Sequence, residues 1–241
     1  MGVLIKLTDR IYRLPGQSET DQPNLYYVRG DLKSAAIDAG QSRRHVEEFY
    51  GALREEGLPL PSYTLITHWH WDHTFGLKYI SGVSMASQLT KEKLEKVSRW
   101  SWTTETMRKR EETGEDIAFC NECIRKEYPD LGMISVKTVD QGLDREREMD
   151  LGGVRLRLIP MDSPHSRDAL LIYAPEEKAL FVGDADCEDY YENNGRYDPN
   201  RLKKYLAFIR SLDFDLYCIG HDEPEGKQET IDYLSSQLPE G

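Results

Sequence analysis

Three of the six histidines lie within the segment 67–76, which reads THWHWDHTFG. His68 and His70 are two residues apart, so in an extended chain both side chains point to the same face. Asp72 and His73 follow directly, where a loop can turn them back toward the same point. Neutral imidazole and carboxylate are good ligands for zinc, iron or manganese. The segment therefore predicts a metal site where a strand passes into a loop.

Three more candidate ligands each follow an apolar segment later in the chain. His165 comes after LIPMDSP, Asp184 after ALFVG, and His221 after LYCIG. Five of the six histidines are thereby placed at predicted strand ends. The sixth, His45, falls on a predicted helix, and we interpret it as a surface residue.

The elements that must position these ligands are predicted from hydrophobic periodicity. A helix capped by Ser42 is expected from about 43 to 56, because apolar residues recur there at helical spacing. Two more helices are expected at 201–212 and 227–238. Strands are predicted at 3–7, 10–14, 24–30, 34–40, 63–66, 83–86, 134–139, 154–160, 170–175, 179–185 and 216–221. This order favours sheet-on-sheet packing with helices outside.

A charge-rich segment at about 87–150 separates the first ligand cluster from the later ones. We expect a helical insert within a single domain 1–241, with two helices broken near Thr113-Gly114. Its aromatic residues, Trp100, Trp102, Phe119 and Tyr128, fit a lid over the substrate pocket or a homodimer interface. They fit equally well a helical pair that buries against the sheet.

The composition limits the partners and the cellular compartment that we expect for this protein. The net charge of −12 disfavours nucleic acid or an anionic membrane as a partner. The N-terminal sixteen residues do not resemble a signal peptide, and the four cysteines, Cys120, Cys123, Cys187 and Cys218, fit reduced thiols. We therefore expect a cytoplasmic protein that acts on a small molecule. The lone CxxC at Cys120 and Cys123 is interpreted as structural.

Together these motifs resemble the metallo-β-lactamase-fold hydrolase superfamily. The resemblance rests on HxHxDH at 68–73, on His165 before a serine, on LFVGD ending at Asp184, and on the final Gly220-His221 pair. It implies an α+β fold, a four-layer αββα sandwich with metals at one edge. Two departures are visible: Phe75-Gly76 replaces a frequent double glycine, and Ser163 replaces the glycine of PGHS.

The resemblance also implies how the ligands divide between two ions. One ion would be held by His68, His70 and His165, the other by Asp72, His73 and His221, with Asp184 bridging them. True β-lactamases of the best-known class have Arg or Cys among the second set. Since this chain has His73 and no Cys at position 184, it is closer to the glyoxalase II, lactonase and phosphodiesterase branches.

Such a pair of divalent ions, zinc before manganese or iron, can hold a bridging hydroxide as nucleophile. Asp72 is the candidate catalytic residue, which orients this hydroxide and passes a proton to the leaving group. We therefore predict a dinuclear hydrolase that cleaves an ester, thioester, lactone or phosphoester. The alternatives are an iron-dependent oxidoreductase or dioxygenase of the same fold, an RNA-processing nuclease, which the acidic charge disfavours, and a metal-loaded sensor, which the complete ligand set disfavours.

Two further features bear on the site. Asp38 ends a predicted strand and can either hold the outer N–H of a ligand histidine or serve as a turn residue. The irregular segment after Asp184 can reach over the metals, with Tyr190, Tyr191 and Arg196 as candidate substrate contacts. The alternative is a plain surface loop with aromatic anchors.

Overall fold

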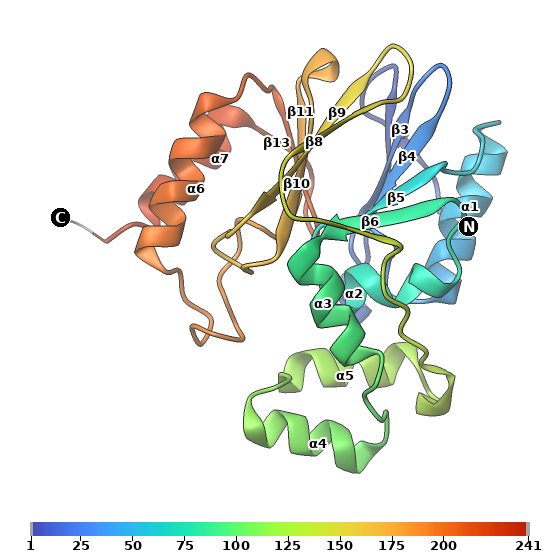
Figure 1. The fold of residues 1–241 in the computed structure, drawn as a ribbon, viewed down its shortest axis with the longest axis vertical. Helices are drawn as coiled ribbons and strands as arrows, with labels where there is room; N and C mark the ends of the chain where they lie inside the picture. The colour runs from blue at the N-terminus through green and yellow to red at the C-terminus, as the bar shows by residue number, and fades with distance from the viewer. Residues whose placement is uncertain (1, 240–241) are drawn as a thin grey trace.

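Two β-sheets pack face to face at the centre of the molecule, and helices cover both outer faces (Figure 1). The structure is a computed structural model that describes residues 2–239. The seven-stranded sheet contains, in chain order, β1 (Ile5–Lys6), β2 (Ile11–Leu14), β3 (Leu25–Arg29), β4 (Ser34–Ile37), β5 (Tyr63–Leu65), β6 (Val83–Ser87) and β7 (Gln141–Leu143). The six-stranded sheet contains, in spatial order, β13 (Glu225–Gly226), β12 (Leu216–Ile219), β11 (Ala179–Gly183), β10 (Ala169–Ala174), β9 (Arg155–Met161) and β8 (Arg147–Asp150).

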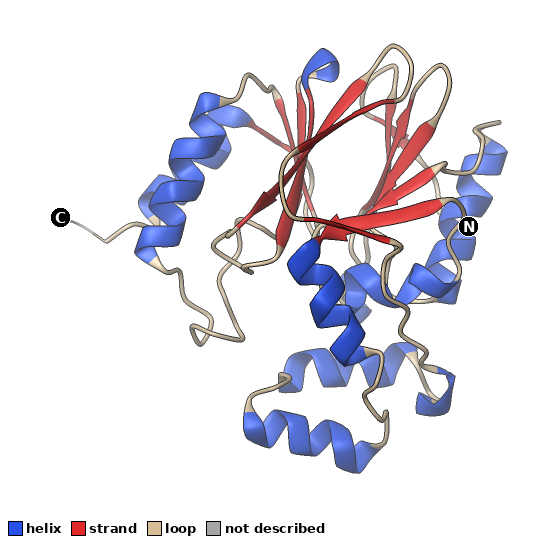
Figure 2. Cartoon of the chain, in the orientation of Figure 1, coloured by secondary structure: helices blue, strands red, loops and turns tan. Residues whose placement is uncertain are grey.

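Both sheets are mixed, with hairpins followed by parallel crossovers. In the first sheet β1 to β4 run antiparallel, and β4 to β7 are parallel to their neighbours. In the second sheet β8 to β11 are antiparallel and β12 lies parallel to β11. The parallel strands β5, β11 and β12 therefore end on the same side of the sandwich (Figure 2), where their following loops meet.

The main core lies between the sheets. It joins residues such as Ile37 and Leu65 of the first sheet to Leu158, Ile172 and Phe181 of the second, all at most 1% exposed. Because successive strand residues point to opposite faces, each strand also sends side chains outward to a covering helix. This double burial explains why strands such as ALLIYA and ALFVG are apolar along their whole length.

The outer layers are formed by amphipathic helices. On the first sheet lies α1 (Arg43–Glu55), whose Val46, Phe49 and Leu53 pack against the sheet. Its N-terminus is capped by Ser42, whose hydroxyl accepts the N–H of His45 at 3.3 Å. On the second sheet lie α6 (Pro199–Ser211) and α7 (Lys227–Ser236). The predicted four-layer αββα sandwich is thus confirmed.

His45 does not lie at the surface as we expected. It is 0% exposed, because it sits on the buried stripe of α1, four residues before Phe49. Its ring packs against the turn at Gly40, where an added Cβ would lie 2.4 Å from His45 Nδ1. Neither ring nitrogen has a hydrogen-bond partner among residues 2–239, and burial lowers the pKa of His45 to about 3.

The segment after β6 forms three helices, where we expected two. They are α3 (Gln88–Val97), α4 (Thr104–Thr113) and α5 (Ala118–Glu127), and the expected break near Thr113-Gly114 separates the last two. Gly114 ends α4 with φ +72°, a backbone conformation that glycine adopts readily. At the lower edge of Figure 1, these helices project beyond the sheets on the side where the ligand loops lie.

The helical part of the predicted insert is shorter than 87–150. Residues 134–139, predicted as a strand, are extended but pair with no described strand, whereas β7 and β8 fall inside the interval and belong to the two sheets. Short helices complete the fold: α2 (Trp71–Thr74), η1 (Ser18–Thr20), η2 (Phe75–Lys78), η3 (Leu131–Met133) and η4 (Pro175–Glu177). Within residues 2–239 no helix combines the length and apolar character needed to cross a bilayer.

Candidate metal centre

The first four candidate ligands follow β5. His68 lies in the loop after the strand, and His70 directly precedes α2, a single helical turn that carries Asp72 and His73. We expected a loop at this place. The helical turn brings Asp72 and His73 to the same side as the preceding histidines, and all four side chains are buried.

The remaining ligands come from loops of the second sheet. His165 lies between β9 and β10, Asp184 directly follows β11, and His221 follows β12. Gly220 precedes His221, and a Cβ there would lie 2.1 Å from Asp184 Oδ1. A side chain at position 220 would therefore displace the Asp184 carboxylate. This steric constraint explains why a glycine precedes His221.

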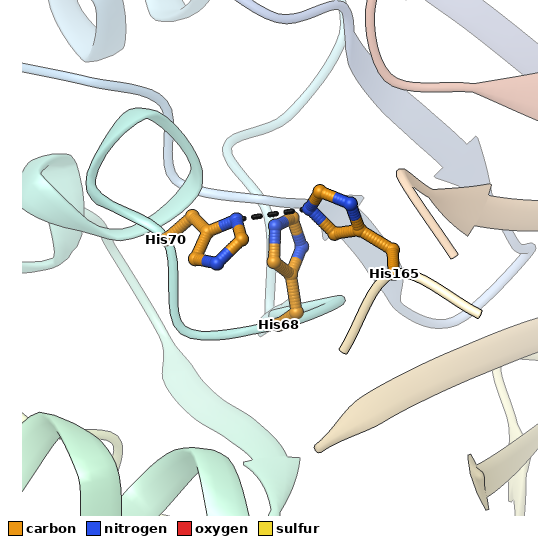
Figure 3. Close-up of side chains that lie close together, drawn as sticks. All are labelled: His68, His70 and His165. Carbon is orange, nitrogen blue, oxygen red and sulfur yellow. Dashed lines mark hydrogen bonds between the residues drawn. The ribbon is translucent and has the colours of Figure 1, made fainter. Parts of the chain in front are cut away.

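The seven predicted ligands meet in two adjacent groups. The first consists of His68, His70 and His165, and the second of Asp72, His73, Asp184 and His221; within each group the donor atoms lie within 4.8 Å of one another. Figure 3 shows the three rings of the first group pointing toward one another, His68 and His70 from one loop and His165 from another, with His70 Nδ1 3.0 Å from His165 Nε2.

Asp184 lies between the two groups. Its Oδ2 is 3.9 Å from the Nε2 atoms of both His68 and His165 in the first group. It is 3.3 Å from His73 Nε2 and 3.4 Å from His221 Nε2 in the second. One carboxylate oxygen is thus close to ligand nitrogens of both groups, which is the place of a bridging ligand.

Outer hydrogen bonds fix which nitrogen of each ring faces the centre. His165 Nδ1 lies 2.7 Å from the carbonyl oxygen of Glu188, which can only accept, so Nδ1 carries the proton and Nε2 keeps a lone pair. His73 Nδ1 is held in the same way by Asp38 Oδ2 at 2.8 Å. Asp38 also accepts the backbone N–H of Thr67 at 2.7 Å. The structure therefore supports the first of our two interpretations of Asp38.

The donor set fits divalent metal ions. The Nε2 atoms of His68 and His73, Asp72 Oδ2 and Asp184 Oδ1 are buried and have no hydrogen-bond partner among the described residues. Leaving such atoms unpaired is costly, whereas a shared cation would satisfy them together. Ligands at about 2.1 Å from a tetrahedral ion lie roughly 3.4 Å apart. The distances from His73 Nε2 to Asp72 Oδ2, 3.0 Å, and to Asp184 Oδ2, 3.3 Å, are close to this spacing.

The electrostatics of the two groups differ. Burial and the neighbouring histidines lower the pKa of His68 well below its usual value, so its ring is neutral. Burial also acts against protonation of His73, but the carboxylates of Asp72 and Asp184 outweigh it and hold the pKa of His73 well above its usual value. Asp184 keeps a pKa well below its usual value despite burial, because His73 and His221 lie beside it. The second group therefore favours positive charge, and protons and metal ions compete for it.

A cavity of about 390 Å³ opens onto these ligands. Its polar floor includes His70, Asp72, His165, Asp184 and His221. The rest of the wall is apolar apart from Asp21, and is formed by Ile117, Phe119, Cys120, Cys187, Tyr190 and Tyr191. Of the described residues that line this cavity, none is Lys or Arg. Its chemistry suits an uncharged, apolar part of a substrate that places a polar bond near the ligands.

The three predicted substrate contacts fall at different places. Tyr190 and Tyr191 line the cavity, whereas Arg196 is exposed and is not among its lining residues. Tyr191 also stacks on His70, with ring centroids 4.8 Å apart, and its hydroxyl donates to Asp116 at 3.1 Å. The loop after Asp184 is thereby joined to the helical insert over the ligands. Substrate contact by these residues remains a prediction.

The sequence did not indicate several residues of this wall. Asp21 follows η1 in the left-handed region, at φ 57°, and its Oδ1 lies 3.7 Å from His221 Nδ1. Burial and the Asp72 carboxylate raise the pKa of Asp21 to about 6. Ile117 and Phe119 come from the insert. None of these has a sequence signal that separates it from an ordinary turn or helix residue.

The remaining predictions near the site concern Trp69, Trp71 and the cysteines. Because Trp69 and Trp71 alternate with the candidate ligands along the chain, we expect both to point away from the metals into the core. Both are buried in the insert core, and Trp69 also lies beside His70, with ring centroids 4.7 Å apart. Cys120 and Cys123 are buried in the same core and Cys218 between the sheets, in agreement with a packing role. Cys120 and Cys187 also line the cavity.

Comparison with known proteins agrees with this geometry. The chain matches the family model described as the metallo-beta-lactamase superfamily over residues 19–221. Solved structures similar over 98% of the chain include a metallo-beta-lactamase from Pontibacter korlensis (TM-score 0.67, 15% identity, 99% of that chain). A second is the sec-alkylsulfatase Pisa1 from Pseudomonas sp. (TM-score 0.69, 16% identity, 41% of that chain). At these identities the structural matches show the fold alone.

Curated relatives include two proteins named as thioesterases. The acyl-coenzyme A thioesterase MBLAC2 of Gallus gallus is 27% identical over 177 residues, which cover 68% of this chain and 57% of the relative. The atrochrysone carboxyl ACP thioesterase of Aspergillus fumigatus is 33% identical over 78 residues, 31% of this chain and 25% of the relative. The matched part of the chain thus covers between a quarter and somewhat over half of the length of these relatives.

Proposed function

Since the chain belongs to the metallo-beta-lactamase superfamily, we propose that it is a metal-dependent hydrolase that cleaves an ester or thioester bond of a small-molecule substrate. The observation that carries this proposal is the convergence of seven candidate ligands, six of them buried and His221 exposed, five of which line a cavity with a largely apolar wall. The two thioesterase-named relatives support the thioester in particular. Lactones and phosphoesters remain in the panel of substrates to be tested.

The residues fit a pair of divalent ions, with zinc as the first candidate. His68, His70 and His165 would hold one ion, Asp72, His73 and His221 the other, and Asp184 would be shared. Such ions, when bound, lower the pKa of a water molecule and polarise the substrate carbonyl. The completeness of the second ligand set favours two ions over the single iron of a dioxygenase, and metal analysis with an oxygen-uptake assay separates the two.

The chain's own residues position the substrate and move the proton. The apolar wall holds the acyl part and limits the access of bulk water to the reacting bond. Asp72 lines the cavity, and its Oδ2 lies 3.0 Å from His73 Nε2 and 3.2 Å from His221 Nε2. These neighbours keep the pKa of Asp72 well below its usual value against the effect of burial, so the carboxylate is ionised. It can therefore accept a hydrogen bond from the attacking water and orient it, and in this proposal it then passes a proton to the leaving thiol or alcohol.

A substrate panel tests this proposal. Purified protein reloaded with zinc, manganese or iron is assayed with esters, thioesters, lactones and phosphodiesters that share one small acyl or aryl group. Asp72→Ala is expected to lower kcat/KM for the best substrate by about 10²- to 10⁴-fold. The matched control is Asp9→Ala, whose carboxylate is 96% exposed and far along the chain from the ligands.

Two outcomes would contradict the proposal. One is full activity in Asp72→Ala and in His70→Ala, because both residues are assigned to the reacting centre. The other is a protein with both sites loaded that hydrolyses no member of the panel. Hydrolysis of phosphodiesters alone would keep the metal chemistry but replace the thioester by another substrate class.

A further inference from the structure

A second, smaller cavity also has Tyr191 in its wall. Its volume is about 160 Å³, and it shares His70, His165 and Tyr191 with the larger cavity. It is therefore a second approach to the same ligands. Unlike the larger cavity, it is lined by basic side chains, Lys93 of α3 and Arg167 of the loop after His165.

Lys93 is the distinctive residue of this second cavity. Its ammonium lies 4.2 Å from the centre of the Trp69 ring, and Trp69 in turn contacts the ligand His70. The side chain is partly buried, and this burial lowers the pKa of Lys93. Among residues 2–239, no carboxylate oxygen lies within 4.0 Å of its Nζ. Such a desolvated cation interacts strongly with any anion that reaches it.

The other charges of this cavity already have partners or are open to water. Arg167 pairs with Glu192 at 2.7 Å, and Asp189 pairs with Arg201 at 2.8 Å. Glu115 is exposed and is not within ion-pair distance of Lys93. Lys93 is thus the cation of this cavity that makes no ion pair within residues 2–239, although the carboxylates of Asp168, Glu115 and Asp116 act on it from beyond 4.0 Å.

The overall charge makes a local cation favourable for binding an anionic substrate. With a net charge of −12, the protein repels anions at long range. Lysine is a suitable point charge for phosphate or carboxylate, and the ammonium of Lys93 is held here over the ring of Trp69.

We infer that Lys93 binds an anionic group, phosphate or carboxylate, on the leaving-group part of the substrate, while the acyl part occupies the larger cavity. This inference rests on the proposed hydrolase function and adds the substrate's charge and orientation to it. Lys93 is then a specificity-determining residue, outside the seven ligands.

Three thioesters with the same butyryl group test the inference. Their thiols are N-acetylcysteamine, which is neutral, glutathione, which carries carboxylates, and coenzyme A, which carries phosphates. In the wild-type protein, kcat/KM is expected to be higher for at least one anionic thioester than for the neutral one. In Lys93→Gln this preference should fall by about 3- to 30-fold, mainly through KM, and Lys93→Arg should restore part of it. The control is Lys96→Gln, an exposed residue of α3 that lines neither cavity.

Binding supplies a readout that does not depend on turnover. The non-hydrolysable S-butyl thioethers of the same three thiols are titrated into wild type and Lys93→Gln by calorimetry. A preference for an anionic thioether that is lost in Lys93→Gln supports the inference, and the preferred thiol identifies phosphate or carboxylate. Equal Kd values for all three in wild type would overturn it, as would an equal loss on neutral and anionic compounds in Lys93→Gln. If the anionic thioethers bind through Lys93 but no thioester is hydrolysed, the proposed hydrolase function fails instead.

Discussion

Asp38 contacts the candidate centre indirectly, through a hydrogen bond to the outer nitrogen of the His73 ring. Its carboxylate accepts from His73 Nδ1 at 2.8 Å and from the N–H of Thr67 at 2.7 Å, so it fixes both a ligand and the loop that carries the others. Asp38 adopts φ 65°, a conformation that Asp and Asn tolerate better than other residues with a side chain. Residues that hold ligands in this way commonly affect metal affinity nearly as much as the ligands do.

We predict that Asp38→Asn weakens metal binding at the second ligand group by about 10- to 100-fold. Asparagine keeps the size and the backbone conformation, but a neutral amide holds the His73 N–H less strongly than a carboxylate does. Competition with a chromophoric chelator measures the affinity, with Asp9→Asn as the exposed control. An unchanged affinity would show that Asp38 serves only the fold.

A second prediction at the scale of residues concerns His45 and the pH dependence of folding stability. Its pKa is about 3 in the folded protein, below the value of 6.5 expected in the unfolded chain. Below pH 6.5 the unfolded chain therefore binds an additional proton, and the protein loses up to about 1.4 kcal/mol of stability per pH unit until the folded pKa is reached.

His45→Leu should reduce this acid dependence, because leucine fills the same apolar site and does not titrate. The measurement is the free energy of unfolding in urea at pH 5.0 and 6.5, on metal-free wild type and variant. An identical pH slope in the two proteins would mean that His45 does not titrate on unfolding as described.

At the scale of elements, the helical insert contributes to the cavity wall and also packs on the ligand loop. Ile117, Phe119 and Cys120 line the cavity, while the surrounding insert residues form one core with Trp69, Trp71 and Phe75. The helix α5 is linked to α1, which covers the first sheet, by an ion pair between Glu127 and Arg44 at 2.6 Å. The insert therefore forms part of the cavity wall. Its aromatics do not bury against the sheet, because Trp100, Trp102 and Tyr128 pack partly buried on the ligand segment and Phe119 is 57% exposed. Its roles as a lid and in a homodimer stay predictions.

We predict that Phe119→Ala flattens the dependence of activity on acyl-chain length. Burial of each methylene contributes about 0.8 kcal/mol, so kcat/KM in wild type should rise by up to about fourfold per methylene until the cavity is full. Removing the Phe119 ring should lower this gradient and leave the shortest ester least affected. Leu89→Ala, an exposed apolar residue of α3, is the control and should keep the wild-type gradient.

At the scale of the whole molecule, the candidate centre joins the two sheets. Four of its ligands follow β5 of the first sheet, and His165, Asp184 and His221 follow strands of the second. Ions bound there would cross-link segments separated by about a hundred residues. Because the unfolded chain does not hold these ligands together, metal binding should stabilise the fold by mass action.

We expect removal of metal to lower Tm by about 5–10 °C. At a free metal concentration of about a hundred times Kd, metal binding raises the free energy of unfolding by roughly 2.7 kcal/mol, which corresponds to this shift for a chain of this size. Differential scanning calorimetry of zinc-loaded and chelator-treated protein measures the shift. In Asp184→Asn, which lacks the shared carboxylate, the difference between the two states should shrink. An equal Tm with and without zinc would argue against ion binding at these residues.

The sequence by itself determined the layers and the seven ligands. Hydrophobic periodicity is a local property, and strands that end on one side of a sandwich bring their following residues together whatever lies between them. The helix from Ser42, the apolar strands and the strand-end His and Asp residues were therefore predictable, as was the family, whose model covers residues 19–221.

Only the tertiary structure decided the surroundings of that centre. Residues 134–139 have the pattern of a strand but pair with none in the described chain, because pairing depends on distant neighbours. The burial of His45, the approach of Asp21 to His221, and the two cavities that share Tyr191, one largely apolar and one charged, depend likewise on packing between remote segments. Local periodicity carries no information on such contacts, since it records which face of an element is buried and not what the element is buried against.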